Sequence, residues 1–211
     1  MKLDRKSLLL YAVTDRTWAK NQTLLDQVED ALDAGVTFLQ LREKEMGEDE
    51  FLEEARKMKQ LAHQYHVPFV INDNVPVALQ SDADGVHVGQ TDMKVGTVRA
   101  LLGPEKILGV SVQTVLQAKA AEADGADYLG VGAVFNTSTK KDAAEVSYKT
   151  LYEICNAVSI PVVAIGGISS DNIKLLSGSG ISGIAVVSAL FASDSISKST
   201  EQLKKEIEEI V

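Results

Sequence analysis

Short apolar, β-branched runs alternate with longer stretches of helical periodicity along the chain, and few folds accommodate this alternation. Between the runs, apolar residues recur three and four positions apart, as in Leu24, Val28, Ala31 and Leu32, which is typical of amphipathic helices. Strands that alternate with helices indicate βαβ units and a parallel sheet. Eight runs are predicted to be strands: residues 8–14, 37–42, 67–72, 85–88, 107–112, 128–133, 162–165 and 184–187.

Eight such units in 211 residues leave roughly 26 residues each, which favours a compact α/β fold, the (β/α)₈ TIM barrel. A repeated phrase supports this prediction, because a small residue and a glycine lead into every second predicted strand. We expect the glycine to adopt the left-handed conformation that ends a helix. No linker interrupts the pattern, so residues 1–211 are predicted to form a single domain. The phrase occurs at residues 34–40, 83–89, 124–130 and 180–186.

The charge balance excludes two classes of partner. The chain has 21 Lys and Arg against 30 Asp and Glu, a formal net charge of −9, so it lacks the basic excess that binding to nucleic acid or a membrane surface requires. Its one cysteine, Cys155, cannot form an internal disulfide, which fits a reducing compartment. The apolar run at residues 8–13 is too short for a signal peptide, and we expect a cytoplasmic protein. The sequence leaves the oligomeric state open, a homo-oligomer included.

Polar residues alternate at the end of the second predicted strand, as Gln40, Arg42 and Lys44. Alternate side chains of a strand share one face, so these three can point together into the mouth of the barrel, where such folds keep their active sites. An arginine fork and a lysine ammonium both suit phosphate oxygens. The alternative is an ordinary solvated charge run over residues 42–45.

Carboxylates follow the third and fourth predicted strands, at Asp73 and Asp92. Two carboxylates that act together with substrate phosphates are typical of Mg²⁺ sites, so both are candidate ligands for Mg²⁺. The alternative for Asp73 is a turn or helix cap before Val75 and Pro76. His87 lies inside the fourth strand and is interpreted as a hydrogen-bonded core residue rather than a ligand.

The ends of the last two predicted strands suggest a phosphate site. Gly166 and Gly167 follow the seventh strand, and Val187 and Ser188 end the eighth, where small residues can present backbone N–H groups to a phosphate. Residues 169–171 are good N-cap residues and predict a helix after the glycines. A tight turn is the alternative for the glycine pair.

The fifth and sixth predicted strands also lead into polar residues. Ser111 lies at the end of the fifth strand, and Thr137, Thr139 and Lys140 belong to a polar loop over residues 136–147 after the sixth. Because barrel active sites are built from such loops, this one is a candidate lid.

The final segment of the chain is predicted to be the last barrel helix. Ser199 and Gln202 match a capping box at its start, and Leu203, Ile207 and Ile210 share one side of it. A partner-binding helix is the alternative.

Six short motifs occur in order along the chain: Gln40-Leu-Arg42-Glu-Lys44, Ile71-Asn72-Asp73, residues 85–92, Gly109-Val-Ser111, Thr137-Ser-Thr139-Lys140 and Ile165-Gly166-Gly167-Ile168. Each is weak alone, but together they resemble the thiamine phosphate synthase family over nearly the whole chain. Members of that family are (β/α)₈ barrels, so the resemblance implies the same fold as the periodicity.

The resemblance also implies a reaction and a set of site residues. Members of the family join 4-amino-2-methyl-5-hydroxymethylpyrimidine diphosphate to 4-methyl-5-(2-phosphoethyl)thiazole, which releases diphosphate and forms thiamine phosphate. By resemblance, the pyrimidine diphosphate is bound by Gln40, Arg42, Lys44, Asn72, Ser111 and Lys140; Mg²⁺ by Asp73 and Asp92; and the thiazole phosphate by Thr137, Thr139, Gly167, Val187 and Ser188. Arg42, Lys44, Ser111 and Lys140 are the residues expected to act in catalysis.

The mechanism implied by the resemblance is dissociative. Mg²⁺ and the basic side chains neutralise the departing diphosphate, the aminopyrimidine carries the cation left on its methylene, and the thiazole nitrogen attacks it. No protein nucleophile is required, which is consistent with a sequence in which we find no catalytic triad or acid–base pair.

Two departures from the family pattern bear on the alternatives. Gln113 stands where relatives often have His, and in the similar thiazole tautomerases a His there is thought to move the proton. Gln113 therefore argues against a tautomerase, as does the retained set of basic residues. Asn136 stands where Pro is common in the loop after the sixth strand. The other alternative is an inactive paralogue that binds thiazole phosphate or thiamine phosphate.

Overall fold

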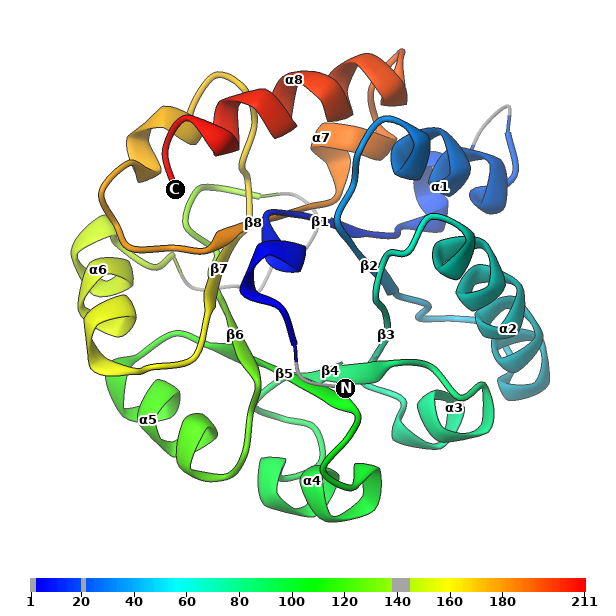
Figure 1. Cartoon of the computed structure of the whole chain (residues 1–211), viewed down its shortest axis with the longest axis horizontal. Coiled ribbons are helices and arrows are strands. Elements are labelled where there is room, and N and C mark those ends of the chain that lie inside the picture. The colour runs from blue at the N-terminus through cyan, green and yellow to red at the C-terminus, as the bar shows by residue number, and fades with distance from the viewer. Residues whose placement is uncertain (1–2, 20–21, 138–144) are drawn as a thin grey trace.

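The protein is a closed barrel of eight parallel strands, which confirms the predicted fold (Figure 1). The computed structural model describes residues 3–19, 22–137 and 145–211. Each strand pairs with its neighbour in the sequence, and β1 pairs with β8 to close the ring. The strands are β1 (Leu10–Val13), β2 (Phe38–Leu41), β3 (Phe69–Asn72), β4 (Gly85–Val88), β5 (Ile107–Val112), β6 (Tyr128–Val131), β7 (Val162–Ile165) and β8 (Gly183–Val186).

Helices surround the ring of strands on its outer side (Figure 1). In the described residues, no helix has the length and apolar character needed to cross a membrane. The α-helices are α1 (Leu24–Asp33), α2 (Glu48–Gln64), α3 (Val75–Gln80), α4 (Val95–Leu102), α5 (Val115–Ala123), α6 (Tyr148–Ala157), α7 (Ser188–Phe191) and α8 (Ile196–Glu208). Short 3₁₀ helices are η1 (Arg5–Leu8), η2 (Arg16–Trp18) and η3 (Ile173–Leu176).

The strands are buried on both faces, so the barrel has an outer and an inner core. Successive side chains of a strand point to opposite faces, and in β2 Phe38 belongs to the inner core whereas Leu39 belongs to the outer one. Burying each large side chain contributes about 1.5–3 kcal/mol. The inner core consists of Leu8, Tyr11, Val13, Phe38, Val70, Ile107, Tyr128, Val163 and Ala185.

The segment before β1 covers one end of the inner core. In Figure 1, η1 lies over the middle of the ring, and its last residue, Leu8, is fully buried among the inner side chains. The predicted strand over residues 8–14 therefore begins two residues late, because Leu8 ends η1. Gly183 allows this closure, since a Cβ there would lie 1.9 Å from the carbonyl oxygen of Leu8.

The glycines of the repeated phrase divide into two roles. Gly35, Gly125 and Gly180 have φ values of 108°, 95° and 87°, as predicted for residues that reverse the chain after a helix. The prediction is wrong for Gly85, which lies in β4. There a Cβ would lie 2.0 Å from the carbonyl oxygen of Ile107, so the glycine permits close approach of β5 instead. Asp82 supplies the left-handed residue of this turn, with φ 54°.

Two helix predictions are corrected by the structure. The last helix, α8, begins at Ile196 with Ser195 as its N-cap, so Ser199 lies inside the helix and caps nothing. Its hydroxyl is 2.6 Å from that of Ser193. After β7, residues 169–171 do not cap an α-helix, because the segment forms the one-turn helix η3 with Asn172 at its N-cap.

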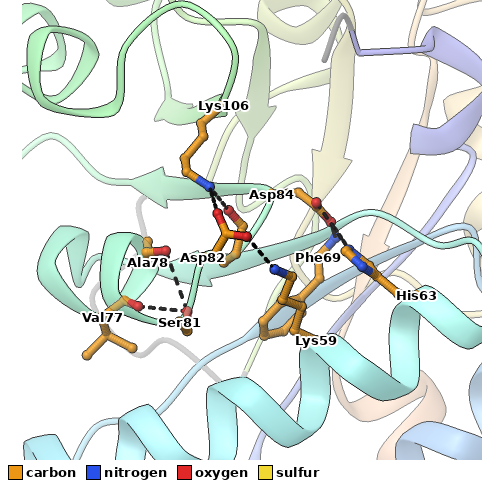
Figure 2. A network of polar contacts seen from close by, with 10 residues as sticks. Lys59, His63, Phe69, Val77, Ala78, Ser81, Asp82, Asp84 and Lys106 are labelled. Atoms are coloured by element: carbon orange, nitrogen blue, oxygen red, sulfur yellow. Dashed lines mark hydrogen bonds and ion pairs between the residues drawn. The ribbon is translucent and has the colours of Figure 1, made fainter.

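A polar network joins the N-terminal ends of β3, β4 and β5 (Figure 2). The carboxylate of Asp82 accepts hydrogen bonds from Lys59 on α2 and from Lys106 just before β5, both at 2.8 Å. Asp84 lies 2.9 Å from the Nε2 of His63 and accepts the backbone N–H of Phe69. Because active sites of this fold lie at the opposite end of the strands, we interpret the network as a stabilising one.

We expect Asp82→Asn to destabilise the fold by about 1 kcal/mol or less at pH 7, since the carboxylate is 76% exposed and solvent weakens its ion pairs. The two lysines lower the pKa of Asp82 to about 2 from its ordinary 3.8. A lowered folded-state pKa stabilises the fold above the unfolded pKa and ceases to do so as the pH falls through the folded value. The difference between wild type and variant should therefore shrink between about pH 4 and pH 2.

Urea unfolding at several pH values measures this difference. Asp171→Asn is the matched control, because Asp171 is an exposed carboxylate in the loop before η3. An equal loss of stability in both variants at pH 7, or a difference that persists at pH 2, would contradict the role assigned to Asp82.

Candidate active site

The rim of the barrel at the end of β2 is fixed by a contact with the end of β1. Thr14 is fully buried, donates its backbone N–H to the carbonyl oxygen of Gln40 and accepts the backbone N–H of Arg42 on its hydroxyl at 2.9 Å. The predicted Gln40 side chain is buried inside the barrel, and its Nε2 donates to the hydroxyl of Tyr11. The Lys44 side chain is exposed on the rim.

Two of the charged residues after β2 form ion pairs with different partners, so this segment is not simply a solvated run of charges. Glu43 forms an ion pair with Arg16 at 2.9 Å. The guanidinium of Arg42 is largely buried and lies 3.9 Å from Asp15. Glu43 therefore pairs with Arg16 and not with Arg42. The contact between Arg42 and Asp15, at 3.9 Å, is too long for a hydrogen bond, so the guanidinium of Arg42 is suited to bind a second anion.

The two carboxylates proposed as metal ligands follow adjacent strands. Asp73 comes directly after β3, donates its N–H to the carbonyl oxygen of His87 on β4, and accepts a hydrogen bond from Asn72 at 2.6 Å. Its φ of 61° is unusual for a residue with a side chain, and such strain is concentrated at functional sites. Asp92 accepts the N–H of Gly89 at 2.7 Å, which folds the loop after β4 back on itself.

These side chains fit Mg²⁺ in their chemistry. Carboxylate oxygens are the hard donors that Mg²⁺ prefers, and it is usually held by one or two of them together with substrate phosphates and water. Over residues 3–19, 22–137 and 145–211 there is no cluster of three or more His, Cys, Asp or Glu that could hold a metal. Asp73 and Asp92 alone would therefore leave most of the coordination shell to phosphate and water.

Ser111 on β5 is joined by one hydrogen bond to β4 and by another to the loop after β4. Its hydroxyl lies 2.9 Å from the Nε2 of His87, and its carbonyl oxygen accepts the side-chain amide of Gln90 at 2.8 Å. The Nδ1 of His87 lies 3.0 Å from the hydroxyl of Tyr128. His87 is buried, so the interpretation as a hydrogen-bonded core residue is confirmed.

The glycines after β7 allow its loop to pack against the loop after β6. Gly166 and Gly167 have φ values of 102° and 66°, and a Cβ on Gly167 would lie 2.3 Å from the carbonyl oxygen of Asn136. Asn172 bridges the turn, donating to the carbonyl oxygen of Gly167 and accepting the N–H of Ser169. A side chain larger than hydrogen could not replace Gly167 without moving both loops.

The last strand leads directly into α7. Val187 is the N-cap residue of this helix, and Ser188 is its first residue; both are half-buried. Thr137 is half-buried at the end of the described part of the loop after β6. Thr139 and Lys140 lie outside the described residues, as does most of the candidate lid over residues 136–147.

Comparison with known proteins identifies the family. A family model described as "Thiamine monophosphate synthase" matches residues 10–190, which include all eight strands. The chain belongs to this family. The thiamine-phosphate synthase of Clostridium botulinum is 46% identical over 201 residues, 95% of this chain and 94% of that one. That of Clostridioides difficile is 48% identical over 94% of both chains. The chain is thus a transferase of thiamine biosynthesis.

A solved structure that is similar to this chain agrees with the fold. The thiamine phosphate pyrophosphorylase of Pyrococcus furiosus superposes with a TM-score of 0.90, at 40% identity over 98% of both chains.

Three residues at or below the rim were not singled out from the sequence. Tyr11 and Tyr128 lie within apolar strands, where Tyr11 contacts the predicted site residue Gln40 and Tyr128 contacts His87. Thr14 fixes the rim at β2. A signal was present in the sequence, because a tyrosine inside a fully buried strand must find a partner for its hydroxyl. Hydrophobicity alone assigns such residues to the core.

The described residues form two surface cavities between helices. One of about 520 Å³ lies between α1 and α2 and is lined by Arg16 and Lys57 as well as by Glu50, Glu53 and Glu54. Another of about 440 Å³ lies between α1 and the α7–α8 region and includes Asp30 and Asp194. Neither cavity is lined by Arg42, Lys44, Asp73 or Asp92, so neither coincides with the candidate site at the ends of β2, β3 and β4.

We expect Thr14→Val to destabilise the fold by about 1–3 kcal/mol, because it leaves the partly buried N–H of Arg42 without its acceptor. Thermal or urea unfolding measures the loss. Thr200→Val is the matched control: Thr200 is equally buried, but its hydroxyl donates to the carbonyl oxygen of Ile196, one turn back in α8. If both variants lose the same stability, the contact between Thr14 and Arg42 has no special role.

Proposed function

We propose that this enzyme joins 4-amino-2-methyl-5-hydroxymethylpyrimidine diphosphate to 4-methyl-5-(2-phosphoethyl)thiazole, which releases diphosphate and forms thiamine phosphate. The observation that carries the proposal is the arrangement of three neighbouring strand ends. Basic residues follow β2, and carboxylates follow β3 and β4, with Gln40 paired to Val70 and Asn72 paired to His87 in the strand register. A diphosphate and its Mg²⁺ can therefore bind side by side at one edge of the barrel mouth.

The basic side chains are proposed to bind the departing diphosphate. Arg42 and Lys44 approach it from β2, and the hydrogen bond from Arg42 to Thr14 fixes the backbone that carries them. Lys140 is assigned to the same group by the family resemblance alone. Mg²⁺, when bound by Asp73 and Asp92, supplies further neutralisation of the charge that develops on the leaving group. Catalysis then consists of positioning and electrostatic stabilisation, with no protein nucleophile.

The rings are proposed to lie over the inner core, with Gln40, Asn72 and Ser111 at the aminopyrimidine. The thiazole phosphate is assigned to the opposite side of the mouth, at the loops after β6, β7 and β8. The close approach of Gly167 to Asn136 supports one shared anion pocket there. The residues assigned to that pocket are Thr137, Thr139, Gly167, Val187 and Ser188.

The contacts of Gln113 favour the synthase reaction over thiazole tautomerisation. Its side-chain amide donates to the carbonyl oxygen of Gly132, and its backbone N–H donates to the side chain of Gln117. An amide is too weak an acid and too weak a base to gain or lose a proton near neutral pH, so Gln113 cannot move a proton between ring positions as an imidazole can.

The enzyme is proposed to work in the cytoplasm on small molecules, without nucleic acid. Cys155 is consistent with a reducing compartment, because it has no disulfide partner, and burial raises the pKa of its thiol to about 11, which lowers its reactivity.

Incubation of the purified protein with both substrates and Mg²⁺ tests the proposed reaction. We expect thiamine phosphate and diphosphate in equal amounts. Arg42→Ala should lower kcat/KM by about 10²–10³, since it removes one fixed charge from the leaving-group site. Arg56→Ala, on the outer side of α2, is the control for loss of a surface arginine. Tight binding of the thiazole phosphate without any product would instead indicate a binding protein.

We expect Asp73→Asn and Asp92→Asn each to raise the Mg²⁺ concentration required for half-maximal activity by about tenfold or more, because a neutral amide is a weaker ligand than a carboxylate. Titration of activity with Mg²⁺ measures this shift. Asp171→Asn again serves as the control. An unchanged Mg²⁺ requirement in both rim variants would show that these carboxylates do not bind the metal.

A further inference from the structure

A continuous chain of hydrogen bonds crosses the inside of the barrel below the rim. It begins at Gln40 on β2, passes through two tyrosines on β1 and β6 and a histidine on β4, and ends at Ser111 on β5. The distances are 2.5 Å from Gln40 Nε2 to Tyr11 OH, 2.8 Å from Tyr11 OH to Tyr128 OH, 3.0 Å from Tyr128 OH to His87 Nδ1, and 2.9 Å from His87 Nε2 to Ser111 Oγ. These hydrogen bonds thus join Gln40 and Ser111, two residues assigned to the aminopyrimidine.

The packing of the inner core holds the middle of this chain in place. Tyr11 and Tyr128 are 2% and 0% exposed, and the ring of Phe38 packs edge-on against both. Gly109 makes room for the contact between Tyr128 and His87, because a Cβ there would lie 2.2 Å from the tyrosine ring and 2.5 Å from His87 Nδ1. A residue with a side chain at position 109 would therefore break the contact between Tyr128 and His87.

Each residue of this hydrogen-bonded series can donate only a limited number of protons. Burial raises the pKa of both tyrosines above its ordinary value, so each hydroxyl keeps its single proton. The amide of Gln40 donates to Tyr11, whereas the distances alone admit either direction at the contacts of Tyr128 with Tyr11 and with His87. In the order that continues from Gln40, Tyr11 donates to Tyr128 and Tyr128 donates to His87 Nδ1, which leaves the ring proton on Nε2 facing Ser111. This order runs in one direction from β2 to β5.

We propose that this relay orients the hydroxyl of Ser111, so that its oxygen accepts from His87 and its proton is presented to the substrate in the barrel mouth. Tyr11, Tyr128 and His87 are then positioning residues, which act on the substrate only through Gln40 and Ser111. The role of Ser111 as a donor to substrate rests on the proposed function, whereas the proton order within the relay does not.

Nitrogen NMR of the protein labelled with ¹⁵N-histidine tests the proton order without turnover. The sequence has three histidines, and the spectrum of His87→Gln identifies the signals of His87 by their loss. We expect His87 to be the neutral tautomer with its proton on Nε2 near pH 7.5. In Tyr128→Phe, which removes the donor to Nδ1, we expect this preference to weaken. A proton on Nδ1 in the wild type, in either the neutral or the charged ring, would overturn the proposal.

A double-mutant cycle tests whether the relay acts through Ser111. Tyr128→Phe should lower kcat/KM on the order of tenfold in the wild type, as expected for one lost hydrogen bond in a buried network. In the Ser111→Ala background the same change should cost less than about twofold. Val163→Ala is the control, because Val163 is a fully buried inner-core residue that contributes no hydrogen bond to the relay; its effect should be equal in the two backgrounds.

The outcomes separate this inference from the proposed function. An equal effect of Tyr128→Phe in both backgrounds of an active enzyme would overturn the relay's role, even though the synthase reaction stands. A proton on Nε2 in a protein that makes no thiamine phosphate would support the relay and overturn the function. If Tyr128→Phe does not fold, the wild-type spectrum still decides the proton order.

Discussion

The interior of a closed barrel must be filled by side chains, and in this barrel some of those side chains carry polar atoms. Tyr11, Phe38 and Tyr128 occupy the middle of the ring, with the two tyrosine hydroxyls in contact with each other. Because a buried hydroxyl without a partner is costly, these two must be satisfied by further side chains. The partners are Gln40 and His87, and through His87 the contact extends to Ser111. The requirement to satisfy the inner core therefore also fixes two side chains that are proposed to bind the substrate, those of Gln40 and Ser111.

The fold could be predicted from the sequence because it depends on patterns that repeat. Three strands, over residues 85–88, 107–112 and 162–165, have the predicted bounds, and the other five differ by one or two residues at one or both ends. The errors occur where local geometry overrides pattern. The capping box at Ser199 is a match within a helix that already began at Ile196. The segment after β7 has good cap residues but forms only one 3₁₀ turn.

The candidate site was predictable in part, and the limit has a physical cause. Strand alternation predicts that Gln40 and Arg42 share a face, and the ends of β3 and β4 predict that Asp73 and Asp92 share an edge, because parallel strands end together. Roles beyond that, such as binding of the thiazole phosphate, come from the family resemblance. The relay through Tyr128 could not be predicted, since it depends on five strands meeting inside a closed ring.

The central claim is that a diphosphate and Mg²⁺ bind at the ends of β2, β3 and β4. A crystal structure of the protein with Mg²⁺ and 4-amino-2-methyl-5-hydroxymethylpyrimidine diphosphate, without the thiazole that would consume it, tests this most directly. The account predicts Mg²⁺ between Asp73, Asp92 and the diphosphate, with Arg42 and Lys44 on the diphosphate oxygens. A diphosphate bound at the cavity between α1 and α2, or Mg²⁺ bound away from both aspartates, would contradict it.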